Sequence, residues 1–226
     1  MNRSTVTTPH YSPSTAGAGR VHLTLLGPAR FTVPGVVDDE PLTPRRALLT
    51  GLLADAGRAG VPRERLGALL WPHADAPRAS NAAKQMVHKL RQQIGVTNII
   101  EMGVVVRFNH DVTSTDLAAL LEAERMGRHE DVITLCKGRF LDGVEAWEPA
   151  DLEHWLDAQR RRAMRVLRDA TLALASAHEA VGDTIGAERR WAQLVERHPS
   201  DEWARERLAA VQRSASGDGN RQLTNK

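Results

Sequence analysis

The hydrophobic residues of this chain change their spacing in a fixed order, and this order limits the folds that the chain can adopt. Apolar and polar residues alternate at 21–25, as in a half-buried strand. From 44 to 94 the apolar residues recur every three or four positions, as in amphipathic helices. β-Branched runs return at 99–106, and beyond 113 the spacing is helical again. The order predicts short strands, three helices and a hairpin, followed by an all-helical second half.

The first half is expected to open with two or three short strands. Gly27-Pro28 ends the alternating run, and residues 31–33 and 36–37 flank Pro34-Gly35, a combination typical of a tight turn. Three helices are predicted next. They cover 44–56, with Thr43 as cap and Pro44 in first position, then about 62–71 and 80–94, with 72–79 as a loop.

Helix pairs are expected in the second half. The predicted helices cover 115–126, 129–137, 150–181, 184–197 and 201–212. Small residues at helical spacing let two antiparallel helices approach closely, and their positions here resemble one tetratricopeptide unit. These residues are Ala173, Ala177, Ala180, Gly182 and Ala187, with Pro199 after the second helix.

The predicted helix at 80–94 separates apolar from polar residues clearly. Its apolar positions, spaced by four, three and four, are Ala83, Val87, Leu90 and Ile94. The polar positions on the other side are Asn81, Lys84, Gln85, His88, Arg91 and Gln92. The stretch from Ala76 to Ile100 contains four Lys or Arg and no acid, which suits a polyanion; a solvated helix face is the alternative.

Composition and motifs exclude several classes of protein. One cysteine, Cys136, excludes an intramolecular disulfide, and its apolar segment predicts a buried thiol. No apolar run is long enough to span a membrane, and residues 1–19 lack the apolar core of a secretory signal. The chain has no Walker loop, no GxGxxG and no clustered histidines. We therefore expect a cytoplasmic protein that is not an enzyme and has no cofactor or metal.

Several motifs resemble those of one bacterial regulator family. They are Leu-Leu-Gly-Pro at 25–28, Leu-Thr-Pro-Arg-Arg-Ala-Leu-Leu at 42–49, Glu-Arg-Leu-Gly-Ala-Leu-Leu-Trp at 64–71 and Asn-Ala-Ala-Lys-Gln-Met-Val-His-Lys-Leu-Arg at 81–91. In this order they are similar to the DNA-binding half of the SARP-type transcriptional activators, which is an OmpR/PhoB-like winged helix. Residues 138–143 and 153–157 resemble the bacterial transcriptional activator domain that follows it in that family.

The resemblance implies a mainly α fold with two domains. A disordered leader is expected at 1–19, a winged-helix DNA-binding domain at 20–112, a tetratricopeptide-like activator domain at 113–213 and a flexible tail at 214–226.

Groove reading without a covalent step is the mechanism that the resemblance implies. An α-helix fits the major groove, where amide and cationic side chains reach base edges. The expected base-reading helix is 80–94, with Lys84, Gln85 and His88 as base readers beside Asn81. Phosphate contacts are expected from Lys89, Arg91, Gln92, Arg45, Arg46 and Arg78, and Arg107 is the cation available to the hairpin, or wing.

The implied partners are promoter DNA, a second copy of the chain on that DNA, and RNA polymerase or its sigma factor. The resemblance therefore implies a transcriptional activator that is associated with the nucleoid. A different class of function stays open: the helical repeats could bind proteins, with the winged helix turned into a protein-binding module.

Overall fold

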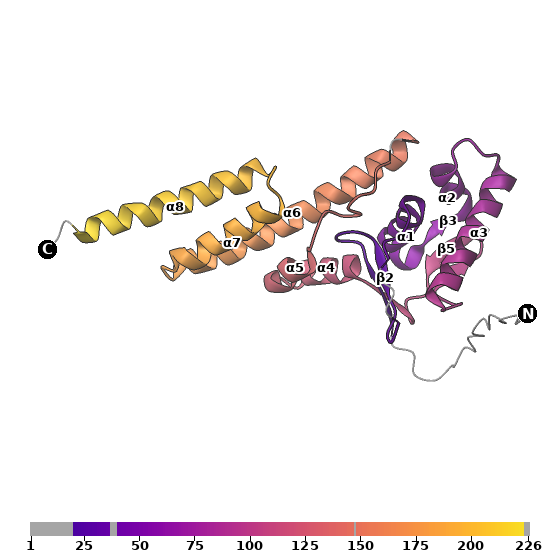
Figure 1. Ribbon diagram of the computed structural model, residues 1–226, viewed down its shortest axis with the longest axis horizontal. Helices are drawn as coiled ribbons and strands as arrows, with labels where there is room; N and C mark the ends of the chain where they lie inside the picture. The colour runs from indigo at the N-terminus through magenta and orange to yellow at the C-terminus, as the bar shows by residue number, and fades with distance from the viewer. Residues whose placement is uncertain (1–19, 37–39, 147, 224–226) are drawn as a thin grey trace, which may run out of the picture.

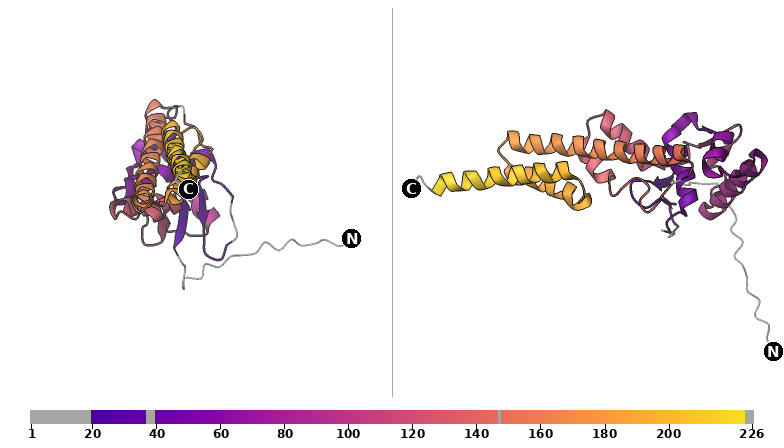
Figure 2. Two further views of the ribbon diagram at one scale, coloured as in Figure 1. Left: turned by 90° about the vertical axis from the view of Figure 1, so that its left-hand side faces the viewer. Right: turned by 90° about the horizontal axis from the view of Figure 1, so that it is seen from above.

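The computed structural model describes residues 20–36, 40–146 and 148–223. The described residues contain two small sheets, which lie with the first three helices at one end of the molecule, and the last three helices extend from there toward the C-terminus (Figure 1). The right-hand view of Figure 2 shows the same elongated arrangement from above, and the left-hand view looks along the long axis. The expected leader, 1–19, lies outside the described residues.

The first sheet joins the beginning of the chain to its middle. It contains β1 (Val21–Thr24), β2 (Arg30–Thr32) and β6 (Thr113–Thr115), with β1 at its centre. β2 is antiparallel to β1 and β6 is parallel to it, so that Val21 lies opposite Thr113. The strand expected at 36–37 is absent at Val36, and Val37 lies outside the described residues.

The first-half helices are α1 (Pro44–Ala56), α2 (Arg63–Leu70) and α3 (Ala76–Ile94). Thr43 and Pro44 start α1 as expected, although the Thr43 side chain makes no capping hydrogen bond. α3 begins four residues earlier than expected, so the loop predicted at 72–79 is shorter. The cause is Asp75, whose side chain caps the helix by accepting a hydrogen bond from the N–H of Arg78.

The predicted hairpin forms part of a second three-stranded sheet. β4 (Ile100–Met102) and β5 (Val105–Phe108) are antiparallel, and β5 also pairs with β3 (Val61–Pro62), a two-residue strand that the sequence did not predict. A short 3-10 turn at Gly57–Ala59 precedes β3. The hairpin is thus fixed to the helical part of the first half on its β3 side.

The second half is helical, as the periodicity predicts. Its helices are α4 (Asp116–Arg125), α5 (His129–Leu135), α6 (Ala150–Ala180), α7 (Thr184–Arg197) and α8 (Glu202–Leu223). α8 was expected to end at about 212 but continues to Leu223, so the tail predicted from 214 begins inside this helix. Residues 224–226 lie outside the described residues. Within the described chain, no helix combines the length and the apolarity that crossing a bilayer requires.

The two halves share a sheet and a network of buried hydrogen bonds. Asp116, at the start of α4, is 4% exposed, and its carboxylate accepts hydrogen bonds from the N–H groups of Leu25 and Leu26 at 2.8–2.9 Å. The N–H of Leu141 donates to the carbonyl of Leu25 at 2.8 Å. The expected boundary at 112/113 therefore falls next to a strand, β6, that belongs to the sheet of the first half.

A buried arginine and a tryptophan add further links. Arg160 of α6 donates to the carbonyls of Phe140, Leu141 and Val144, which holds the loop between α5 and α6 against this helix. The indole N–H of Trp155 in α6 donates to the Asp55 carboxylate of α1 at 2.8 Å. The N-terminal part of the long helix α6 is therefore attached directly to the first half.

Candidate nucleic-acid interface

α2 and α3 form a closely packed helix pair that presents α3 at the end of the molecule (Figure 1). Gly67 of α2 makes this approach possible, because a Cβ atom there would lie 3.1 Å from the Cβ of Ala79. The buried side of α3 carries every apolar position of the predicted stripe: Ala83, Val87, Leu90 and Ile94, with Ala79 before them. The opposite side is therefore free of the core.

Most predicted site residues of α3 lie on its solvent side. The exposed ones are Asn81, Lys84, Gln85, His88, Lys89 and Gln92; we call them the polar face of α3. This face contains amide donors and acceptors, an imidazole and two ammonium groups, and no carboxylate. It is accessible to a nucleic acid, which is the first condition for groove reading.

Arg91 occupies a different environment from the rest of the polar positions. Its Nη2 donates to the carbonyl oxygen of Ile100 on β4 at 2.5 Å, and its Nε is buried without a hydrogen-bond partner. The guanidinium is therefore directed at the backbone of the hairpin, where it fixes the hairpin relative to α3. The sequence assigned it to phosphates because a backbone partner nine residues away has no signature in the helical pattern.

The cations near the helix starts are also engaged to different extents. The Arg45 guanidinium lies 5.9 Å from the centre of the Trp71 ring, a cation–π distance. Arg46 is half-buried, and its Nη1 donates to Oε1 of Gln93 at 2.7 Å. Arg78 is highly exposed, with its Nε 3.5 Å from the Asp75 carboxylate. Of these three, only Arg46 makes a short side-chain hydrogen bond within the described part of the chain.

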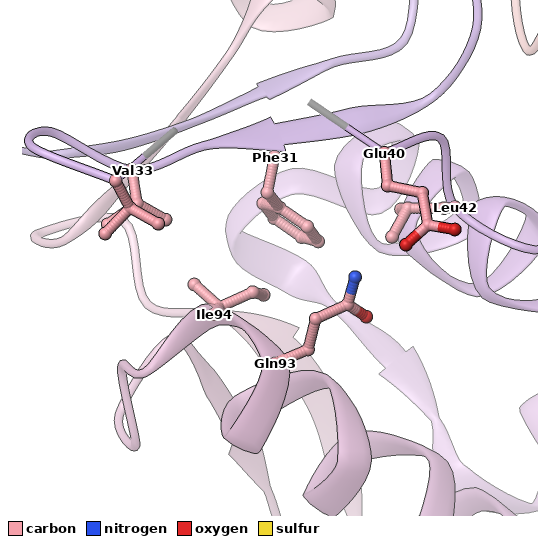
Figure 3. Close-up of a pocket in the computed structure, with 7 residues that line it drawn as sticks. Phe31, Val33, Glu40, Leu42, Gln93 and Ile94 are labelled. Carbon is pink, nitrogen blue, oxygen red and sulfur yellow. The ribbon is translucent and has the colours of Figure 1, made fainter. Parts of the chain in front are cut away.

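Figure 3 shows the surroundings of Gln93, the residue that accepts the Arg46 hydrogen bond. Gln93 and Ile94 point from the end of α3 toward Phe31 of β2, across a small hollow that Leu42 and Glu40 also line. Phe31 and Ile94 are both part of the buried hydrophobic core. The hydrogen bonds of Gln93 with Arg46 and of Arg91 with Ile100 further hold the C-terminal end of α3 in place.

The hairpin carries one acid and one base facing each other. Glu101 of β4 lies opposite Arg107 of β5 in the strand register, and the Arg107 Nε lies 2.7 Å from Oε2 of Glu101. Val104 at the hairpin tip is 82% exposed, and Val105 is exposed beside it. The sequence named Arg107 as the cation of the wing; the structure adds that a carboxylate already holds it.

A second surface lies at the far end of the molecule, on the helical repeats. Of the small residues in the predicted pattern only Ala187 is fully buried, whereas Ala173 is half-buried and Ala177 and Ala180 are exposed. Ala175, which the pattern did not include, is the fully buried small residue of α6. Trp191 is also fully buried and meets Trp203 of α8 edge to face, with ring centres 5.2 Å apart. At the turn between α6 and α7, by contrast, Val181 and Ile185 are largely exposed.

Comparisons with known proteins agree with this architecture. A tetratricopeptide repeat model matches residues 168–211, which cover the end of α6, all of α7 and the first part of α8. Among curated proteins, none matches the chain in sequence.

One solved structure that matches is Mycobacterium tuberculosis EmbR in complex with a low affinity phosphopeptide. The match has a TM-score of 0.57 and 20% identity, and it covers 85% of this chain but 54% of EmbR, so this chain spans about half of that protein. At this identity the match shows a shared fold. The predicted fold class is confirmed, and so, as a similarity of fold, is the resemblance to SARP-type regulators with a winged helix before helical repeats.

Proposed function

On a fold shared with EmbR, we propose that this chain is a sequence-specific DNA-binding regulator of transcription. The observation that carries the proposal is the polar face of α3: exposed, without a carboxylate, and opposite a fully buried apolar stripe. A helix of this kind fits the major groove, where such side chains meet base edges.

Within this proposal the residues divide into two groups. Lys84, Gln85 and His88, with Asn81, read base edges, because amides pair with adenine and ammonium groups with guanine. Phosphates are contacted from the flanks of the face and from the neighbouring helix starts. The phosphate contacts come from Lys89, Gln92, Arg45, Arg46 and Arg78. Arg91 contributes by holding the hairpin against α3.

In this proposal the first half binds DNA, so the helical half is the part of the molecule that binds protein partners. We assign to it contacts with RNA polymerase or its sigma factor and with a second copy of the chain on DNA, which makes the regulator an activator. The exposed Val181 and Ile185 show that apolar surface is available on this half.

Salt dependence of duplex binding is the first test. Each phosphate contact contributes a slope of about −0.9 in a plot of log K against log salt concentration. Fluorescence anisotropy with a labelled duplex should therefore show affinity falling steeply with salt. Lys89→Ala should flatten the slope by about one unit, while Lys137→Ala, an exposed lysine on the helical half, should leave it unchanged.

Base reading is tested separately by selecting sites from a random duplex library. Lys84→Ala should relax the base preference at one position of the selected site. Lys89→Ala should keep the base preference and weaken binding to all sequences alike. Unchanged binding in both variants would refute the assignment of α3 to the groove.

The second candidate function is a protein-interaction adaptor. The observation that favours it is the hairpin, whose single cation is neutralised by Glu101 and whose tip presents valines. An adaptor of this kind would bind duplex DNA weakly, and its affinity would not change with Lys84→Ala or Lys89→Ala.

A further inference from the structure

Glu101 stands out in the part of the chain that would approach DNA. From Ala76 to Phe108 the sequence contains five Lys or Arg residues and a single acid, which is Glu101. Its carboxylate is 48% exposed and the Arg107 guanidinium is 49% exposed, so both groups of the pair are in contact with solvent.

The pair lies next to the polar face of α3. Arg91 belongs to the same helical stripe as Lys84 and His88, at spacings of three and four residues. Its guanidinium binds the carbonyl of Ile100, the residue directly before Glu101. A duplex that lies along Lys84 and His88 therefore meets the hairpin close to the Glu101–Arg107 pair.

The hairpin is held in this place from both sides. Arg91 attaches β4 to α3, and the pairing of Val61 with Val106 attaches β5 to β3. Neither attachment involves the side chain of Glu101. A change at Glu101 should therefore alter the charge of the outer face of the hairpin without moving its backbone.

We propose that Glu101 limits the affinity of this protein for DNA by holding Arg107 and repelling the phosphates that Arg107 could otherwise bind. This inference rests on the proposed function. An exposed ion pair is only weakly stabilising, since water and salt screen it. Loss of the carboxylate should therefore release Arg107 for a phosphate, and that contact should displace one further counterion.

Glutamine is the informative substitution at this position. Glu101→Gln removes the charge that attracts Arg107 and keeps the size of the side chain. The partner variants are Arg107→Gln, which leaves the carboxylate without its cation, and the double variant, which makes the hairpin neutral. Glu101→Thr, a good strand former, provides a second way to remove the charge.

The experiment measures the affinity of each variant for one duplex between about 50 and 200 mM salt. Glu101→Gln should bind more tightly at low salt and show a slope steeper by about 0.9, so that its advantage shrinks about 3.5-fold over this range. Arg107→Gln should keep the slope of the unmodified protein. The double variant should also keep it, because the added slope requires Arg107.

Two results would overturn the inference. One is a slope unchanged in both Glu101→Gln and Glu101→Thr; the other is a steeper slope that persists in the double variant. The proposed function is judged separately by Lys89→Ala. If that variant flattens the slope but Glu101→Gln does not steepen it, the inference alone fails; if the unmodified protein shows no salt-dependent binding, both fail.

Discussion

Replacing Asp116 by alanine should destabilise the protein strongly, because this carboxylate is buried between the two halves. It accepts hydrogen bonds from the N–H groups of Leu25 and Leu26, both fully buried. In the Asp116→Ala variant these two N–H groups keep their burial and lose their acceptor. A buried donor without a partner is costly, since it has given up water without replacement.

The magnitude follows from two opposing contributions. Each unpaired N–H costs about 1–3 kcal/mol, which gives about 2–6 kcal/mol for the pair. Against this, burial raises the pKa of Asp116 more than the hydrogen bonds from Leu26 and Leu25 lower it, so keeping the carboxyl charged has itself a cost that alanine removes. We therefore expect the free energy of unfolding to fall by about 2–4 kcal/mol.

Urea unfolding followed by circular dichroism measures this change, with Asp111→Ala as the control. Asp111 is an exposed aspartate in the turn before β6, and its substitution should cost less than about 0.5 kcal/mol. A loss of less than about 1 kcal/mol in Asp116→Ala would show that Leu25 and Leu26 find other acceptors. That result would refute the conclusion that the Asp116 carboxylate stabilises the contact between the two halves.

Three further predictions concern single sites in the packing of the helices. Gly67→Val should cost about 1–3 kcal/mol in urea unfolding, because even a Cβ atom there would lie 3.1 Å from the Cβ of Ala79; unchanged stability would contradict the close approach of α2 and α3. Burial alone would raise the pKa of Asp201. The hydrogen bonds from Arg168, 2.6 Å away, and from a backbone N–H outweigh this effect, so the pKa lies below its usual value. The stabilisation from this carboxylate is therefore present above about pH 4 and lost as the pH falls through the lowered pKa; Asp201→Asn should lower stability at pH 7 by about 1–2 kcal/mol and much less at pH 2, and an equal loss at both pH values would argue against the ion pair. Burial raises the pKa of Cys136 to about 12, so iodoacetamide at pH 8 should label the folded protein far more slowly than the unfolded chain, and equal rates would show that this thiol is accessible.

The elements that depend on local pattern could be predicted from the sequence. The apolar stripe of α3 lies inward as its spacing predicts, and the bounds of α1, α6 and α7 agree within a residue. Aspartate is a common helix cap, but the prolines on either side of Asp75 led to the prediction of a loop at 72–79. The extension of α8 to Leu223 had no local signal, because serine and glycine are poor helix formers.

The features that depend on distant partners could not be predicted. Arg91 resembles the other cations of its helix in sequence, and only the fold brings the carbonyl of Ile100 to its guanidinium. The Glu101–Arg107 pair requires the strand register, which sequence spacing leaves open. Asp116 falls in the first turn of the helix expected at 115–126, and no local pattern indicates that its carboxylate accepts hydrogen bonds from residues about 90 positions earlier.

Halves that share a sheet cannot swivel about a linker. β6 continues directly into α4, and α6 is bound to α1 through Trp155 and Asp55, so the long helices extend in one fixed direction from the end that carries α3. A duplex turns once in about 10.5 base pairs, so moving the bound site by about five base pairs would carry α6–α8 to the opposite side of the double helix. Under the proposed function, activation should therefore rise and fall with the helical phase between the binding site and the promoter, and not simply decline with distance.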